Sequence, residues 1–230
     1  MEDILCNNIK VLRFVNTPVP SVTYLLVNEN KKRCIVIDPG SKEQNDIRDY
    51  MQKNELTLDY ILLTHEHFDH CWGVNYLKKY FPQARIVATR LCAEWVLKPW
   101  NYFNKLYYNS DEYYQIKHVD LLVEDVGGRI NWEDTLVMFI PTPGHTDKGV
   151  CITIGGKLFT GDTLLYKTRP YIKKRYGGSL VDLRSSINMI YSMFSPHTKI
   201  YPGHGFPFLL EETKSFYIDF FSQRSNEGYQ

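Results

Sequence analysis

Apolar and polar residues follow two different periods along this chain, and the changes of period mark the predicted elements. A sheet-like alternation indicates strands at residues 11–15, 22–27 and 34–37, and short apolar runs indicate buried strands at residues 60–63 and 85–88. Apolar residues three or four apart indicate helices, and those of the first half lie at about residues 43–53, 69–80 and 91–97. Asp69 can cap the second of these helices, and Pro82 stops it.

The second half of the chain follows the same plan without repeating the sequence. Its predicted strands lie at residues 121–126, 136–140, 150–154, 158–160 and 199–201, and its predicted helices at about 180–194 and 210–221. Two β-rich halves with helices outside indicate a layered α/β sandwich. Because no linker rich in Gly, Pro or Ser interrupts the pattern, we expect a single domain over residues 1–230.

The composition is that of a globular protein without a strong electrostatic preference. Its 230 residues are 43% hydrophobic and 23% charged, which suits one large domain. A net charge of +1 gives no general attraction to nucleic acid or anionic lipid, so we expect neither as a partner. An acidic, polar start and the lack of a run of about 18 apolar residues predict a cytoplasmic protein without a membrane span. A monomer and a homodimer are both compatible with the sequence.

The cysteines show no disulfide or zinc-finger pattern. They are Cys6, Cys34, Cys71, Cys92 and Cys151. Their odd number and the absence of Cys-x-x-Cys spacing argue against both kinds of framework. We expect most of them to be buried and reduced. For Cys71, which directly follows His70, a thiolate ligand is the alternative to a packing role.

Residues 65–70 concentrate the groups that bind metals. The segment His65-Glu66-His67-Phe68-Asp69-His70 places three imidazoles and a carboxylate directly after a predicted buried strand. Imidazole nitrogens and carboxylate oxygens are the common ligands of catalytic zinc. The segment therefore predicts a metal site at the end of this strand.

Three further segments carry a possible ligand in the same position after a strand. The ligands are His145 in the segment 141–146, Asp162 after the strand 158–160, and His204 in the segment 202–205. Strand ends are rigid supports, and the Gly and Pro residues beside them permit sharp turns. His118 and His197 match no such segment, and we expect them to be surface or structural residues.

These motifs resemble those of the metallo-β-lactamase superfamily, and most of all its glyoxalase II branch. The matching segments occur in the family's order and are Thr64–His70, Thr142–Thr146, Phe159–Leu164 and Tyr201–Gly205. The resemblance implies an αββα four-layer sandwich, in which two β-sheets are flanked by external helices, with a dinuclear metal site at one edge. It implies a first metal held by His65, His67 and His145, a second held by Asp69, His70 and His204, and Asp162 as the bridge. The implied metals are two divalent ions, with zinc first and iron or manganese as alternatives.

The implied chemistry is hydrolysis of a thioester or ester. Two such ions can share a water of lowered pKa, and the hydroxide that bridges them attacks the carbonyl carbon of the substrate. Asp162 and Asp69 are then the catalytic carboxylates, since Asp69 can also orient the hydroxide. Glyoxalase II has a helical C-terminal extension that helps bind glutathione, whereas 26 residues follow His204. We therefore expect a small anionic thioester other than its usual substrate.

Other functions remain compatible with the same residues. A relative with a single iron, held by two His and one Asp, would oxidise persulfides with dioxygen. A phosphodiesterase or nuclease of this fold would use the basic residues of segment 167–175 to bind the phosphates of a nucleic acid. Flavodiiron oxygen reductases carry Glu where this chain has His67. A metal-binding scaffold without turnover is the alternative outside enzymology. The basic residues 167–175 suit a solvated loop or an anionic substrate tail, and the aromatic segment 95–114 suits a pocket wall, a lid or a dimer contact.

Overall fold

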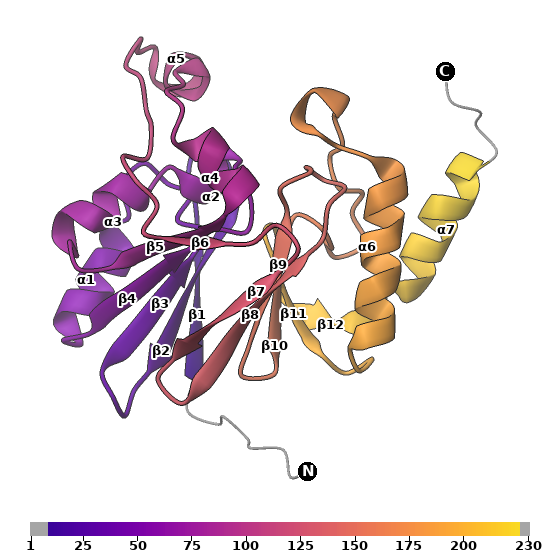
Figure 1. Ribbon diagram of the computed structural model, residues 1–230, viewed down its shortest axis with the longest axis horizontal. Coiled ribbons are helices and arrows are strands. Elements are labelled where there is room, and N and C mark those ends of the chain that lie inside the picture. Colours follow the sequence, from indigo (N-terminus) through magenta and orange to yellow (C-terminus); the bar gives the residue numbers. More distant parts are fainter. Residues whose placement is uncertain (1–8, 226–230) are drawn as a thin grey trace.

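Two six-stranded β-sheets pack face to face in the computed structural model, which describes residues 9–225, and helices cover both outer faces (Figure 1). The first sheet contains β1 (Ile9–Val15), β2 (Val22–Asn28), β3 (Arg33–Ile37), β4 (Thr57–Leu62), β5 (Arg85–Thr89) and β6 (Leu121–Val123) in chain order. The first three strands are antiparallel, and the pairs from β3 to β6 are parallel. The parallel part is the one that carries the predicted ligand segment after β4.

The second sheet is built from the rest of the chain. Its strands are β7 (Gly128–Trp132), β8 (Thr135–Pro141), β9 (Val150–Ile154), β10 (Lys157–Gly161), β11 (Lys199–Pro202) and β12 (Phe208–Leu209). They lie in reverse chain order, and only the β10–β11 pair is parallel. Both sheets are thus mixed, and the predicted four-layer sandwich is confirmed.

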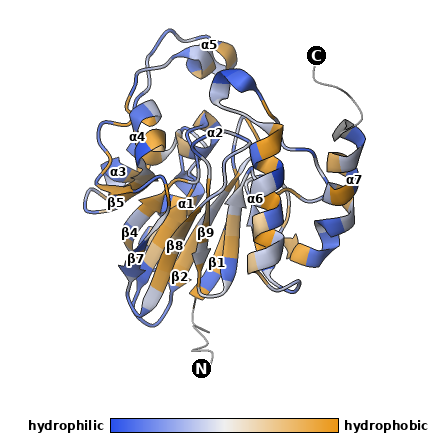
Figure 2. Cartoon of the chain, turned by 45° about the vertical axis from the view of Figure 1, so that its right-hand side comes forward, coloured by the Kyte–Doolittle hydropathy of each residue, from blue (hydrophilic) through white to orange (hydrophobic). Residues whose placement is uncertain are grey.

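Helices form the two outer layers. They are α1 (Asn45–Lys53), α2 (Phe68–Cys71), α3 (Val74–Tyr80), α4 (Arg90–Val96), α5 (Tyr102–Tyr108), α6 (Leu180–Met193) and α7 (Lys214–Ser225). In Figure 1, α1 and α3 lie outside the first sheet, whereas α6 and α7 lie outside the second. Helix α6 is hydrophobic on one side and hydrophilic on the other in Figure 2, because its apolar residues recur every three or four positions.

Three apolar layers hold the sandwich together. One lies between the sheets and includes Leu26, Ile37 and Phe139. A second joins the first sheet to α1, α3 and α4, and a third joins the second sheet to α6 and α7. Each fully buried aliphatic side chain contributes about 1.5–3 kcal/mol. The sheets are therefore rigid supports for the loops at their edges.

The predicted elements are found, with differences that have local causes. The single helix expected over 69–80 is two, α2 and α3, because a backbone hydrogen bond to the Pro39 carbonyl oxygen (2.7 Å) interrupts the helix at Gly73. A side chain there would meet the carbonyl oxygen of Ser41 at 2.7 Å, so the loop before α1 approaches too closely for any larger residue. The short elements α5, β7 and β12 were not predicted, and a 3₁₀ turn at residues 210–213 precedes the last helix.

Two further expectations can be compared with the structure. Four of the cysteines are free and buried, as predicted, and Cys6 lies outside the described residues. Among residues 9–225, no helix combines the length and the apolar character that crossing a membrane requires.

A polar network closes the end of the sandwich opposite the ligand segments. The Asp59 carboxylate is 8% exposed and accepts hydrogen bonds from the Arg33 Nε (2.9 Å) and the Trp132 Nε1 (2.8 Å). Arg33 and Asp59 belong to the first sheet and Trp132 to the second, so this carboxylate links the two layers.

Replacing this carboxylate tests the link. In Asp59→Ala, the buried Trp132 N–H loses its acceptor, and we expect the free energy of unfolding to fall by about 1–3 kcal/mol in urea titrations. The matched control is Asp49→Ala, which removes an exposed carboxylate paired with Arg48 and should change stability by less than about 0.5 kcal/mol. Equal stabilities of the two variants would show that the network does not hold the sheets together.

Candidate metal centre

The predicted ligand segments meet at one edge of the sandwich because they all follow strands that end there. Backbone hydrogen bonds join the two sheets at this edge: Val150 N donates to Thr64 O (2.9 Å), and Val22 N donates to Gly203 O (2.7 Å). Gly203 N also donates to Gly161 O (2.7 Å). The loops after β4, β10 and β11 are therefore fixed to one another before any side chain is considered.

One group of side chains contains His65, His67, His145 and Asp162. One possible ligand atom from each lies within 4.8 Å of those of the other three. The His145 Nε2 is 2.9 Å from the His67 Nδ1 and 3.5 Å from the Asp162 Oδ2. The His145 loop thus faces the His65–His67 segment, although 78 positions separate His67 from His145 in sequence.

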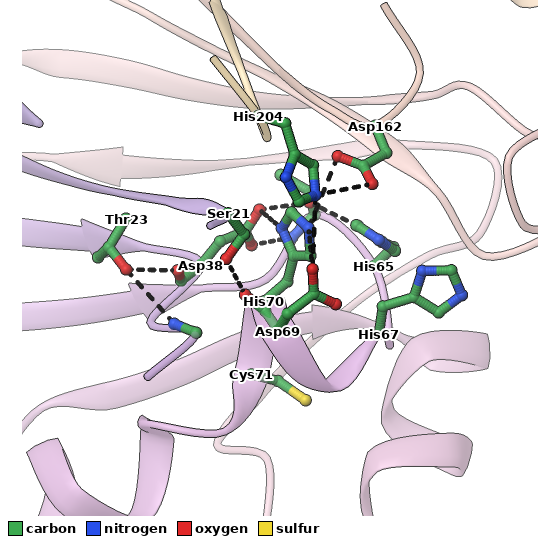
Figure 3. A network of polar contacts seen from close by, with 12 residues as sticks. Ser21, Thr23, Asp38, His65, His67, Asp69, His70, Cys71, Asp162 and His204 are labelled. Carbon is green, nitrogen blue, oxygen red and sulfur yellow. Dashed lines mark hydrogen bonds and ion pairs between the residues drawn. The ribbon is translucent and has the colours of Figure 1, made fainter. Parts of the chain in front are cut away.

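A second group contains Asp69, His70 and His204, with ligand atoms again within 4.8 Å of one another. The His204 Nε2 is 3.4 Å from the Asp69 Oδ2 and 3.4 Å from the Asp162 Oδ2. The His70 Nε2 is 3.6 Å from the Asp162 Oδ1. Asp162 therefore lies between the two groups, and Figure 3 shows its carboxylate facing His204 and His70.

Unpaired buried atoms indicate what these groups are suited to hold. The buried His65 Nε2, His70 Nε2 and Asp162 Oδ1 have no hydrogen-bond partner among the described residues. Leaving such atoms unpaired costs about 1–3 kcal/mol each, whereas bound cations would satisfy them. A side chain at Gly203 would collide with Asp162 and come within 2.7 Å of the His70 ring, so the backbone itself leaves room here. The nitrogen and oxygen donors fit a catalytic metal site, and this set needs no thiolate.

The histidines of the first group are held neutral. Burial lowers the pKa of His65 well below its ordinary value, and the neighbouring imidazoles lower it further. Burial, followed by the proximity of His145, lowers the pKa of His67 to about 3. Burial also lowers the pKa of His145, although Asp162 opposes it. Neutral imidazoles have a free nitrogen lone pair, which is the form that binds a metal.

The second group carries the opposite charge pattern. Burial alone would raise the pKa of Asp162, but His70 and His204 hold it well below its ordinary value. Burial would lower the pKa of His70 and His204, but the carboxylates of Asp162 and Asp69 raise these values to about 9 and about 10. Without a metal cation, both imidazoles are therefore protonated on both nitrogens and positively charged at neutral pH.

Asp38 orients two of the histidines from behind. Its Oδ2 accepts a hydrogen bond from the Thr64 Oγ1 (2.6 Å) and lies 3.0 Å from the His70 Nδ1. The same Thr64 hydroxyl is 3.0 Å from the His65 Nδ1. Such partners fix the ring orientation and raise the basicity of the ligating nitrogen. The sequence analysis did not identify Asp38, although it follows the strand β3 directly, as the predicted ligands follow their strands.

Backbone carbonyl groups orient the remaining histidines. The His145 Nδ1 lies 2.5 Å from the Tyr171 carbonyl oxygen, and the His204 Nδ1 lies 3.2 Å from the Pro20 carbonyl oxygen. A carbonyl oxygen can only accept, so each Nδ1 carries a hydrogen. The Nε2 of the neutral His145 therefore presents a lone pair to the cluster, and that of His204 can do so once its second proton is released. Tyr171 lies within the segment 167–175, which is rich in Lys and Arg, so this loop borders the site.

The aromatic segment also lies beside the cluster. The Phe68 ring, between His67 and Asp69 in sequence, stacks on the rings of Phe103 and Tyr107. The segment is thus fixed to the ligand-bearing turn, and its role as a wall, a lid or a dimer contact stays a prediction.

The histidines without a motif lie elsewhere. His118 contacts Asp120 at 3.1 Å, His197 contacts Glu211 at 3.3 Å, and both imidazoles are exposed, as predicted. The Cys71 sulfur points away from the cluster in Figure 3 and packs in the core below it, so the structure gives it a packing role.

Comparisons with known proteins agree with this geometry. Residues 16–204 match the family described as Metallo-beta-lactamase superfamily. The probable polyketide biosynthesis zinc-dependent hydrolase BaeB of Bacillus velezensis is 32% identical over 185 residues, which cover 80% of this chain and 72% of that protein. Hydroxyacylglutathione hydrolase 1 of Vibrio vulnificus is 31% identical over 201 residues, which cover 85% of this chain and 67% of that protein. The solved BLEG-1 B3 metallo-beta-lactamase has the same fold, with a TM-score of 0.77 at 23% identity over 90% of this chain and 97% of that one.

The raised pKa values of the second group predict that metal binding releases protons. A pH of 7.5 is below the pKa values of His70 and His204, which are about 9 and about 10, so both imidazoles are positively charged in the metal-free protein. Zinc must displace these protons, and we expect about two to be released per chain from this group. The apparent affinity should therefore rise with pH up to about pH 10, the pKa of His204.

Calorimetric zinc titrations in two buffers of different ionisation enthalpy measure the number of protons. His197→Gln, which changes an exposed imidazole outside the cluster, should release as many as the parent. Zinc binding without proton release at pH 7.5 would contradict the charge pattern described above.

Proposed function

The chain belongs to the metallo-β-lactamase superfamily, and we propose that it is a zinc-dependent hydrolase that holds two divalent cations and cleaves a thioester or ester. The observation that carries the proposal is the position of Asp162, whose carboxylate lies within 3.6 Å of His70, His145 and His204 at once. A carboxylate between two groups of ligands can contact both cations of a dinuclear site.

We assign the ligands as two sets that share one residue. The first cation would be held by His65, His67 and His145, the second by Asp69, His70 and His204, and Asp162 would contact both. The spacing of the ligand atoms and the unpaired buried nitrogens support this assignment. Cations in such a site supply a water of lowered pKa and polarise the substrate carbonyl.

The residues of the chain prepare the site for this chemistry. The neutral imidazoles of the first group present lone pairs, and the ionised Asp162 and Asp69 supply negative charge beside them. The Asp69 side chain is 12% exposed and contacts His204, so one of its oxygens can also orient an incoming water molecule. Asp162 and Asp69 are therefore the carboxylates to which we assign catalytic roles.

The surroundings of the site favour an acyl thioester with an apolar part and an anionic part. A groove of about 470 Å³ begins at His204 and is lined by Leu165, Tyr166, Phe206 and Phe208 among others. The basic residues 167–175 border the other group, since Tyr171 contacts His145. The name of one relative, a hydroxyacylglutathione hydrolase, also supports a thioester substrate, and the name of the other, a zinc-dependent hydrolase, supports zinc as the cation.

Metal removal tests the cofactor. Dialysis against a chelator should lower hydrolysis of a panel of acyl thioesters by at least about 10²-fold, because the water and the polarised carbonyl both depend on the cations. Adding zinc should restore the activity, and elemental analysis should find two metal ions per chain. One iron per chain, no hydrolysis and oxygen consumption with a persulfide would instead favour the mononuclear dioxygenase.

Ligand substitutions test the assignment residue by residue. His67→Ala and Asp162→Ala should each lower kcat/KM by at least about 10²-fold while the thermal unfolding transition persists, since only the cluster is damaged. The matched control is His118→Ala, which removes an exposed imidazole outside the cluster and should leave kcat/KM unchanged. Full turnover by either ligand variant would refute the assigned roles.

A further inference from the structure

A buried ion pair joins two of the ligand-bearing segments without contributing to either group. The side chains of Glu66 and Lys148 are each 5% exposed, and the Lys148 Nζ is 3.6 Å from the Glu66 Oε1. Among the described residues, neither side chain supplies an atom to the two ligand groups. Lys and Glu are almost never buried unless they are paired, so a pair in this position needs an explanation.

The pair joins the two segments that carry the first group. Glu66 stands between His65 and His67 in sequence, and Lys148 follows His145 by three residues. The second carboxylate oxygen of Glu66 accepts a hydrogen bond from the Thr146 Oγ1 (3.0 Å). Both oxygens of Glu66 therefore face the His145 loop and link it to the turn that bears His65 and His67.

Lys148 also contacts the two segments that flank the site. Its ammonium group contacts the Asp147 carboxylate and lies 5.1 Å from the centroid of the Trp95 ring, at the start of the aromatic segment. Asp147 in turn packs against Gly177, which has a φ of +75° and no space for a side chain. Gly177 closes the loop whose Tyr171 carbonyl group orients His145. Lys148 and its neighbour Asp147 together thus connect three segments around the first group.

We propose that Lys148 is a positioning residue, which holds the His145 loop against the His65–His67 turn through Glu66 and thereby fixes the geometry of the first cation site. The inference rests on the ligand assignment proposed above. The second group is oriented by different contacts, from Asp38 to His70 and from Pro20 to His204. Loss of Lys148 should therefore act on one cation site and leave the other largely intact.

The positive charge of Lys148 also compensates the buried carboxylate of Glu66. Removing it leaves the Glu66 carboxylate buried with the Thr146 hydroxyl as its remaining partner on the loop, and an unpaired buried charge is strongly destabilising. Replacing both partners by neutral groups of similar shape removes that penalty. A double substitution should thus recover much of what the single substitution loses.

Cobalt titration followed by visible absorption tests the inference without a substrate. We expect the parent to bind two Co²⁺ in separable steps, and Lys148→Met to weaken one step by about 10–100-fold, with a change in the ligand-field bands of that step. The other step should change little. Glu66→Gln/Lys148→Met should bind more tightly than Lys148→Met at the affected step.

Lys78→Met is the matched control. The Lys78 side chain is 17% exposed and donates to the carbonyl oxygens of Pro82 (2.9 Å) and Ala84 (2.6 Å), away from both groups. Its Co²⁺ binding should equal that of the parent.

The outcomes separate this inference from the proposed function. Two unaltered Co²⁺ steps in Lys148→Met would overturn the positioning role while the ligand assignment stands. If Lys148→Met does not fold, the double variant decides: one step weaker than in the parent, with the other step unchanged, supports the role, whereas two parental steps overturn it. A parent that binds fewer than two Co²⁺ would overturn the ligand assignment, and the inference with it.

Discussion

The contact of one buried carboxylate with two groups of imidazoles is the interaction on which this site depends. Asp162 is ionised despite its burial because His70 and His204 lower its pKa. Its two oxygens face different partners, with Oδ1 toward His70 and Oδ2 toward His145 and His204. Without this carboxylate, the two groups would be neighbouring sites without a common ligand.

The sandwich makes that contact possible by bringing the ends of strands from both sheets to one edge. Asp162 and His204 follow strands of the second sheet, whereas His65 to His70 follow a strand of the first. Backbone hydrogen bonds such as Val150 N to Thr64 O join the sheets at this level. The apolar layer between the sheets keeps the edge in register, so the precision of the site depends on burial at a distance from it.

Much of this architecture can be predicted from the sequence because long periodic segments and short motifs are local signals. The run of apolar residues in β2 and the helical spacing in α6 predict their elements, and the His65–His70 segment predicts its own chemistry. Asp38 could not be assigned in advance, since its role arises from contacts with Thr64 and His70 that only the fold creates. The pairing of Lys148 with Glu66 was not foreseen for the same reason, and β12, with two residues, is too short to show a period.

X-ray absorption at the zinc edge of the zinc-loaded protein tests the central claim most directly, because it reports the ligands and any neighbouring metal together. Two cations joined by Asp162 predict a shell of nitrogen and oxygen atoms at about 2.0–2.2 Å, with no sulfur, and metal–metal scattering at about 3.5–4 Å. A sulfur ligand at about 2.3 Å, or zinc ions without a metal neighbour, would contradict the account.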